Sequence, residues 1–341
     1  MSLIAMAGRL AEQAPLPDAV LALGMRHLVA KQARLRTVSD QAADEQFAIQ
    51  MEAFPVADHP DQANAQHYEV PAEFFAHALG ARRKYSSCLY PKGTESLNEA
   101  EAIALLETCA HAQLRDGQDV LELGCGWGSL SLWMAERYPH SHITSVSNSA
   151  SQREYIESEA RKRGFTNLRV ITADMNEFQA PAKFDRIVSV EMFEHMANWR
   201  ALLSRVNGWL KDDGRLFIHI FTHAGAPYRF DYRDQDDWIA QHFFTGGIMP
   251  SHGLIRQFPD LFEVEEEWRW SGEHYAKTAR DWLKNYDDSM PAIMPILRET
   301  YGNDAFLWQR RWRMFFLAVE TLFGYAGGDI WAVSHYRLKK A

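Results

Sequence analysis

Asp119-Val-Leu-Glu-Leu-Gly-Cys-Gly-Trp-Gly-Ser129 is the stretch from which the architecture of this chain follows. Its apolar residues Val120, Leu121 and Leu123 predict a short buried strand, and a helical pattern begins near Leu130. The glycines between them suit a turn in which a Cβ atom would block a ligand's approach to the backbone. A strand, a glycine turn and a helix in this order are typical of the nucleotide-binding edge of a doubly wound sheet, where the helix N-terminus favours an anion.

The spacing of these glycines argues against a dinucleotide. Dinucleotide sites carry G-x-G-x-x-G and an acidic residue about 20 residues later. Here the glycines follow G-x-G-x-G, and the next predicted strand, 142–146, ends in Ser147 and Asn148 instead of an acid. A nicotinamide dehydrogenase is therefore disfavoured. The glycine turn then either binds another ligand or is a structural turn that binds nothing.

The chain on either side of this stretch divides into two expected regions. Residues 1–115 predict a helical region, and residues 116–341 predict alternating strands and helices around a mostly parallel sheet. Helices are expected over 3–10, 18–29, 44–54, 97–112, 130–138, 149–163, 199–210, 279–288 and 304–323, with a polar linker at 56–65. Strands are expected over 120–123, 142–146, 168–171, 184–190, 215–221, 262–270 and 330–337. An aromatic-rich insertion at about 222–260 interrupts the alternation and is expected to cover a site.

Composition excludes several classes of protein. A net charge of −9 over 341 residues argues against nucleic acid as the main partner and against a general attraction to anionic membranes. Cys88, Cys109 and Cys125 are too few and too scattered for a disulfide framework or a zinc site, so no metal is expected. No apolar run reaches about 18 residues, and the N-terminus lacks the order of a secretory signal. We therefore expect a cytoplasmic protein without a transmembrane segment.

The predicted strand ends carry the candidate binding groups, because ligands of open α/β sheets bind there. Asn148 and Gln152, beyond the second strand, offer neutral groups to ribose hydroxyls. Beyond the third strand, Asp174 can accept from an exocyclic amine and Met175 can pack on a purine ring. A helix N-cap is the structural alternative for Asp174.

The end of the fourth strand, Val190-Glu-Met-Phe-Glu-His-Met-Ala-Asn198, is the densest group of reactive side chains. Glu191, Glu194 and His195 lie within five residues of one another. The two glutamates are three residues apart, so they share a face if the segment turns helically. A solvated turn for Glu191 and a capping role for His195 are the alternatives, but both are weakened by a strand end that points into a cleft.

The glycine turn resembles motif I of the class I S-adenosylmethionine-dependent methyltransferases. The chain as a whole resembles the superfamily that joins bacterial cyclopropane-fatty-acyl-phospholipid synthases to plant coclaurine N-methyltransferases. The matching stretches, within about 67–338, are HYEVPAEFF, YSSCLY, ELGCGWG, VSNSASQ, FEHM and WAVSH. This resemblance implies an α/β fold with a mostly parallel seven-stranded sheet and helices on both faces. It also implies a lid from residues 1–115 over the cofactor S-adenosylmethionine.

The resemblance also implies a role for each candidate residue. The implied cofactor contacts are Tyr85 and Ser86 over the methionine part, Gly124 and Gly126 beneath it, Asn148 and Gln152 at the ribose, and Asp174 and Met175 at the adenine. Glu191, Glu194 and His195 would face the acceptor.

Two reactions stay open at this point. An N-methyltransferase must remove a proton from its ammonium acceptor, and Glu194 with His195 could attract the cation and accept that proton. In a cyclopropane synthase an alkene attacks the methyl group, and bound bicarbonate deprotonates the carbocation that results. The positions matching that family's bicarbonate site are Cys88, Glu194, His219, Phe221 and Tyr275, where Phe221 departs from the family's isoleucine.

We favour methyl transfer to the nitrogen of a hydrophobic, aromatic amine over transfer to a lipid. Motifs such as Y-S-S-C and the end W-A-V-S-H-Y-R-L-K-K resemble the amine methyltransferases more closely. Trp238, Phe243, Phe244 and Trp331 would suit such an acceptor through burial and cation–π contact, although core packing explains any one of them equally well. A non-catalytic cofactor-binding protein ranks third, because the candidate site is intact. A homodimer is compatible with the sequence.

Overall fold

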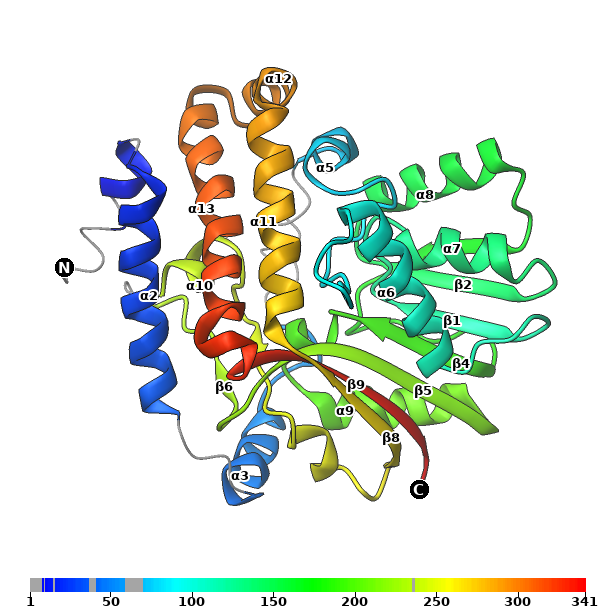
Figure 1. Cartoon of the computed structure of the whole chain (residues 1–341). Helices are drawn as coiled ribbons and strands as arrows, with labels where there is room; N and C mark the ends of the chain where they lie inside the picture. Colours follow the sequence, from blue (N-terminus) through cyan, green and yellow to red (C-terminus); the bar gives the residue numbers. More distant parts are fainter. Residues whose placement is uncertain (1–7, 9, 15, 37–40, 59–69, 235–236) are drawn as a thin grey trace.

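The central feature of the computed structural model is a seven-stranded sheet (Figure 1). The structure describes residues 8, 10–14, 16–36, 41–58, 70–234 and 237–341. Most of the helix expected at 3–10 and of the linker expected at 56–65 lies outside these residues.

The strands follow the order β3-β2-β1-β4-β5-β9-β8. Their bounds are β1 Asp119–Leu123, β2 His142–Ser147, β3 Leu168–Thr172, β4 Phe184–Val190, β5 Leu210–His223, β8 Phe262–Trp270 and β9 Trp331–Lys340. The first five in this order pair in parallel, whereas β9 runs antiparallel to both β5 and β8. The predicted seven-stranded, mostly parallel sheet is confirmed. β5 begins earlier than expected because its ladder with β4 continues across an irregularity to Leu210.

Helices cover both faces of the sheet, as the alternation of strands and helices predicts (Figure 1). On one face lie α6 Leu97–His111, α7 Ser129–Arg137 and α8 Ala150–Arg163, and on the other α3 Gln41–Met51 and α9 Trp199–Trp209. Neighbouring residues of β1 point to opposite faces: Val120 packs with α6 and α7, and Leu121 with α3 and α9. Burial on both faces explains why the strand reads as an almost unbroken apolar run.

A third group of helices packs into a core rich in aromatic rings, in which α2, α13 and α11 lie side by side (Figure 1). Its members are α2 Asp18–Leu35, α5 Ala72–Ala78, α11 Gly272–Asp288, α12 Met290–Tyr301 and α13 Ala305–Phe323. The sequence interpretation missed α12, because Pro291 near its start and Pro295 inside it obscure the helical pattern. It also placed the start of α11 too late.

The remaining elements are short and belong mainly to the segment after β5. They are η1 Phe193–His195, β6 Tyr228–Arg229, α10 Trp238–His242, β7 Ile248–Met249, η2 Leu254–Gln257, η3 Gly302–Asp304 and η4 Tyr325–Gly328. β6 and β7 pair as a small antiparallel ladder. Among the helices in the described part of the chain, none is long and apolar enough to cross a membrane. The division of the chain at about residue 115 stays a prediction.

Candidate active site

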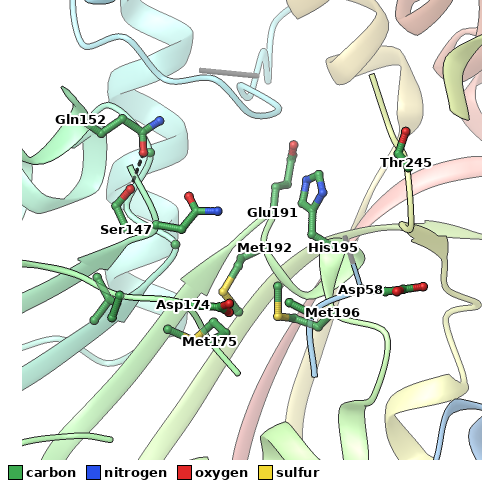
Figure 2. A pocket seen from close by; sticks show the side chains of 16 residues that line it. Asp58, Ser147, Gln152, Asp174, Met175, Glu191, Met192, His195, Met196 and Thr245 are labelled. Atoms are coloured by element: carbon green, nitrogen blue, oxygen red, sulfur yellow. Dashed lines mark hydrogen bonds between the residues drawn. The ribbon is translucent and has the colours of Figure 1, made fainter. Parts of the chain in front are cut away.

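A pocket opens where β1, β2, β3 and β4 end, which is where a parallel sheet binds its ligands (Figure 2). Six of the predicted cofactor residues line it: Gly124, Gly126, Asn148, Gln152, Asp174 and Met175. Tyr85 and Ser86 line a second pocket, which shares Gly124, Gly126, Gln152, Glu191 and His195 with the first. The structure therefore brings all eight predicted cofactor residues to two adjoining spaces.

The glycine turn leaves room for a ligand at one position and for a neighbouring side chain at another. Gly124 has φ +78°, and a Cβ atom there would lie 2.6 Å from the Cβ of Met192. Gly126 has φ +50°, and a Cβ atom there would meet nothing within 4 Å, because this glycine faces the pockets. A side chain at position 126 would fill space that a ligand's backbone contact needs.

Gln152 carries a buried donor aimed at the same space. The Ser149 side chain caps α8, and Ser147 Oγ donates to Gln152 Oε1 at 2.6 Å. Gln152 Nε2 is buried and has no hydrogen-bond partner among the residues that the structure describes. A buried amide needs a partner, and a ribose hydroxyl is one that this position accommodates. The cradle at Gly126 and this donor fit the adenosyl group of S-adenosylmethionine.

The loop between α5 and α6 is held over the second pocket by buried polar contacts. Glu101, on α6, accepts from the backbone N–H groups of Arg82 and Lys84 at 2.8 and 3.0 Å. Farther along, the Cys88 N–H donates to Thr278 Oγ1 at 3.0 Å. These contacts fix the backbone that presents Tyr85 and Ser86 to the pocket.

Glu191 lies at the centre of the site and is held by two donors and a histidine ring. Its carboxylate accepts from the Ser87 N–H at 2.9 Å and from Tyr275 OH at 2.6 Å, and it lies 3.2 Å from His219 Nε2. Its backbone adopts φ +47°, a left-handed conformation that costs a non-glycine residue energy and is typical of functional sites. The Glu191 side chain is 8% exposed and lines both pockets.

Glu194 is close in sequence but lies behind the pocket wall. It is fully buried and absent from the lining of both pockets, and its Oε1 accepts from the Phe221 N–H at 2.7 Å. Burial, reinforced by the charge of Glu191, raises the pKa of Glu194 well above its usual value. Burial also raises the pKa of Glu191, but Lys84 and the donors from Tyr275 and Ser87 oppose this. These directions make Glu191 the more acidic of the two carboxyl groups.

Lys84 lines the second pocket, and the sequence interpretation missed it. It is buried, and its Nζ donates to Ser86 Oγ and to the Ser87 carbonyl, both at 2.6 Å. Burial lowers the pKa of Lys84, while the negative charge of Glu191 opposes that change. Its position before the Y-S-S-C stretch gives no hint of burial, because lysine is normally exposed.

His195 lies beside Glu191 and, like it, lines both pockets. Figure 2 shows the side chains of Glu191 and His195 next to each other, pointing into the pocket and away from Asp174 and Met175. The His195 ring stacks on Phe244, with ring centroids 4.4 Å apart and planes at 25°. Phe244 comes from the segment after β5 and lines the second pocket with Phe221 and Tyr275.

The other aromatic candidates lie away from both pockets. Trp238 donates to Glu12 at 2.8 Å, and Phe243 stacks on Phe315 inside the helical core at 4.4 Å. Trp331 is fully buried on β9 and contacts His223. For these three residues the structure shows core packing, and Phe244 is the member of the set that reaches the site.

The residues predicted to hold bicarbonate lie close together, but two of them bind Glu191. His219 and Tyr275 contact its two carboxylate oxygens, and the Phe221 N–H is taken by Glu194. Cys88 is buried beneath this group, and burial raises the pKa of its thiol. A carboxylate of the chain itself therefore occupies the donors that the bicarbonate hypothesis assigns to an external anion.

Comparison with known proteins connects this geometry to two kinds of enzyme. A family model described as mycolic acid cyclopropane synthetase matches residues 57–330. The chain is similar to (S)-coclaurine N-methyltransferase of Thalictrum flavum subsp. glaucum, at 38% identity over 291 residues covering 84% of this chain and 80% of the relative. It is also similar to cyclopropane-fatty-acyl-phospholipid synthase of Escherichia coli (strain K12), at 31% identity over 238 residues covering 69% of this chain and 59% of the relative.

The solved structures that resemble this chain include the same two kinds of enzyme, an N-methyltransferase and a cyclopropane synthase. A crystal structure of coclaurine N-methyltransferase bound to N-methylheliamine and SAH matches with a TM-score of 0.95 and 32% identity, covering 99% of this chain and 100% of that one. A cyclopropane synthase from Mycobacterium tuberculosis shares the fold, with a TM-score of 0.68 and 19% identity, covering 84% of this chain and 99% of that one.

Proposed function

The chain belongs to the mycolic acid cyclopropane synthetase family and is an S-adenosylmethionine-dependent methyltransferase, and we propose that it methylates the nitrogen of a hydrophobic, aromatic amine. The observation that supports this acceptor is the Glu191 carboxyl group, which accepts hydrogen bonds from Ser87 and Tyr275 and lies beside His195 in the pocket. A buried carboxylate next to an aromatic wall suits a cationic amine, which it attracts and deprotonates.

The proposed cofactor site uses the residues at the strand ends. Gly124 and Gly126 lie beneath the ligand, Gln152 Nε2 and Asn148 hold the ribose, and Asp174 with Met175 bounds the adenine. Tyr85 and Ser86 close the site from the loop above. When bound, S-adenosylmethionine supplies an electrophilic methyl group on a sulfonium centre. The contribution of these residues is alignment and the exclusion of water.

The acceptor half of the site handles a proton. An ammonium group has no lone pair, so the amine must lose a proton before its nitrogen can attack. Glu191 accepts this proton in our proposal, in place of the predicted Glu194, because Glu191 faces the pocket and Glu194 does not. His195 lies beside it and orients the amine against Phe244. Glu194 instead holds the backbone of Phe221 in place.

Cyclopropanation with bicarbonate is the alternative that this geometry disfavours. That reaction needs an external anion bound by groups such as His219 and Tyr275, and both already contact Glu191. Placing a second anion there would bring two negative charges together in a buried site, which costs several kcal/mol. The arrangement therefore supports an acceptor that carries its own positive charge.

The proposed partners follow from composition. A small-molecule amine is consistent with the net charge of −9, which disfavours nucleic acid and anionic lipid surfaces. Three buried, unpaired cysteines suit a reducing compartment, so we propose a cytoplasmic location. Whether the enzyme forms a homodimer stays a prediction.

An assay with two acceptor panels tests this proposal. The purified protein is incubated with methyl-labelled S-adenosylmethionine and either benzylisoquinoline-like amines or vesicles of unsaturated phospholipid. We expect label in the amine panel. Label confined to the phospholipid would refute the N-methyltransferase proposal, as would a bicarbonate requirement that Cys88→Ala removes.

A further inference from the structure

Arg83 is held in a strained backbone conformation in the loop between α5 and α6, where it lines the second pocket. Its φ is +51°, a left-handed conformation that costs a non-glycine residue energy. The N–H groups of Arg82 and Lys84, on either side, donate to the two carboxylate oxygens of Glu101 at 2.8 and 3.0 Å. The N–H of Arg83 itself donates to the Gly80 carbonyl at 2.9 Å. Strain that the surroundings maintain in this way is typical of functional positions.

The guanidinium of Arg83 has a fixed place but an unused donor. It lies over the ring of Tyr155 on α8, with its central carbon 4.1 Å from the ring centroid. Its Nη1 atom is buried and has no hydrogen-bond partner among the residues that the structure describes. A buried donor on a charged group loses its hydration without compensation. The position therefore suits an anionic group that is not part of the chain.

The acidic side chains near Arg83 are engaged with other groups. Glu122 and Glu191 line the same pocket, but Glu122 accepts from Ser131 and Ser145, and Glu191 is held by the contacts described above. On α8, one turn beyond the ring that Arg83 covers, Glu159 pairs with two basic residues of its own helix. These partners leave the Arg83 guanidinium available to a ligand.

Trp127 and Ser129 bring two further unused donors to the second pocket. Trp127 is 2% exposed, and its Nε1 atom is buried without a partner in the described part of the chain, as is Ser129 Oγ. Both residues line the pocket, and α7 begins at Ser129. Because a helix N-terminus also favours negative charge, this end of the pocket suits a carboxylate.

We propose that Arg83 binds the carboxylate of the methionine part of the cofactor, together with Trp127 and Ser129. The planar fork of a guanidinium matches a carboxylate, and Tyr85 and Ser86, which the proposed site assigns to the methionine part, follow Arg83 closely in the same loop. Fixing this end of the cofactor helps to align its methyl group with the acceptor. The inference rests on the cofactor and does not depend on which acceptor is methylated.

A pair of ligands separates a carboxylate contact from a general effect on the loop. The unmodified protein and Arg83→Met are titrated by calorimetry with S-adenosylhomocysteine and with its analogue that lacks the carboxylate. In the unmodified protein we expect the analogue to bind roughly tenfold or more weakly. Arg83→Met should weaken S-adenosylhomocysteine by a similar factor and leave the affinity for the analogue within about twofold. Equal weakening of both ligands, or of neither, would overturn the proposal.

Two further variants of the same loop are the controls. Arg83→Lys keeps the charge without the planar fork and should recover part of the affinity for S-adenosylhomocysteine. Arg82→Met keeps the backbone N–H and removes a guanidinium that lies over Trp133 and donates to the Asn98 carbonyl at 3.3 Å, so both affinities should stay within about twofold. A loss in Arg82→Met equal to that in Arg83→Met would contradict a specific contact. Failure to methylate any amine would overturn the proposed acceptor and leave this binding result unaffected.

Discussion

Glu191 and Glu194 are separated by two residues, and burial raises the pKa of Glu194 further than that of Glu191 because their surroundings differ. Glu191 accepts from a backbone amide and a phenol, and Lys84 lies close enough to favour its charge. Glu194 accepts from one backbone amide, and its second oxygen is buried without a partner among the described residues. A buried carboxyl group with a single donor, such as that of Glu194, favours its protonated form.

Substituting each glutamate by glutamine tests this division. Glu191→Gln removes the base and should lower kcat by roughly 10²-fold or more, while the cofactor Kd measured by calorimetry changes little. Glu194→Gln replaces a neutral acid by a neutral amide of the same shape and should retain most of the turnover. The reverse ranking of the two variants would show that the charge resides on Glu194.

The pH dependence of turnover depends on Lys84. Because the Glu191 carboxylate must be ionised to accept a proton, kcat falls as the pH falls through its pKa, which burial raises above the usual value. Lys84 lowers this pKa, so Lys84→Met should move the acid limb of the profile to higher pH by about one unit. Lys84→Arg keeps the charge and is the control. An acid limb that stays in place or moves to lower pH in Lys84→Met would contradict this role.

The turn between β1 and α7 uses two of its glycines for different purposes. Gly124 has no Cβ atom, and this leaves room for the side chain of Met192, which belongs to the strand end that carries Glu191. Gly126 faces open space in the pockets. One glycine thus maintains the packing of two strand ends, and the other keeps the pocket open.

Alanine substitutions should separate these purposes. Gly124→Ala forces a contact of 2.6 Å at φ +78°, so it should lower the free energy of unfolding by about 2–3 kcal/mol and weaken cofactor binding. Gly126→Ala should cost about 1 kcal/mol of stability but weaken cofactor binding by roughly tenfold. Thermal denaturation and calorimetry measure the two effects. Equal cofactor affinity in Gly126→Ala and the unmodified protein would refute the assignment of this space to the ligand.

Phe244 belongs to the segment after β5, and its ring stacks on the ring of His195 in the site. Phe244→Ala should raise the KM for an aromatic amine by roughly tenfold, because it removes both a wall of the acceptor space and the support of His195. The cofactor Kd should stay within about twofold, because the ring of Phe244 packs against His195 and Phe221, neither of which is among the proposed cofactor residues. Phe306→Ala, at a residue 57% exposed, is the control. An unchanged KM in Phe244→Ala would place the acceptor elsewhere.

The sheet and the residues that line the first pocket could be predicted because local patterns encode them. The strand of Val120 and Leu121 shows its burial directly, and the glycines and Asp174 follow strands whose ends meet at one edge. The position of Glu191 in the pocket could not be predicted, because it depends on donors from Ser87 and Tyr275, which are distant in sequence.

The same limit applies to contacts formed across the whole molecule. His111 and His335 are 224 residues apart, and nothing in either stretch indicates that they meet. The burial of Lys84 and the core positions of Phe243 and Trp331 likewise follow from long-range packing. Periodicity reports which face of an element is apolar, but it does not report what that face meets.

The fate of a labelled methyl group tests the account of the complete enzyme most directly. The protein is incubated with S-adenosylmethionine carrying a trideuteromethyl group, together with an aromatic amine and unsaturated phospholipid in one mixture, and the products are weighed by mass spectrometry. N-methylation transfers the methyl group intact, so we predict an amine that retains all of its deuterium. A phospholipid that has gained a methylene group with one deuterium lost, and an amine without label, would contradict the account.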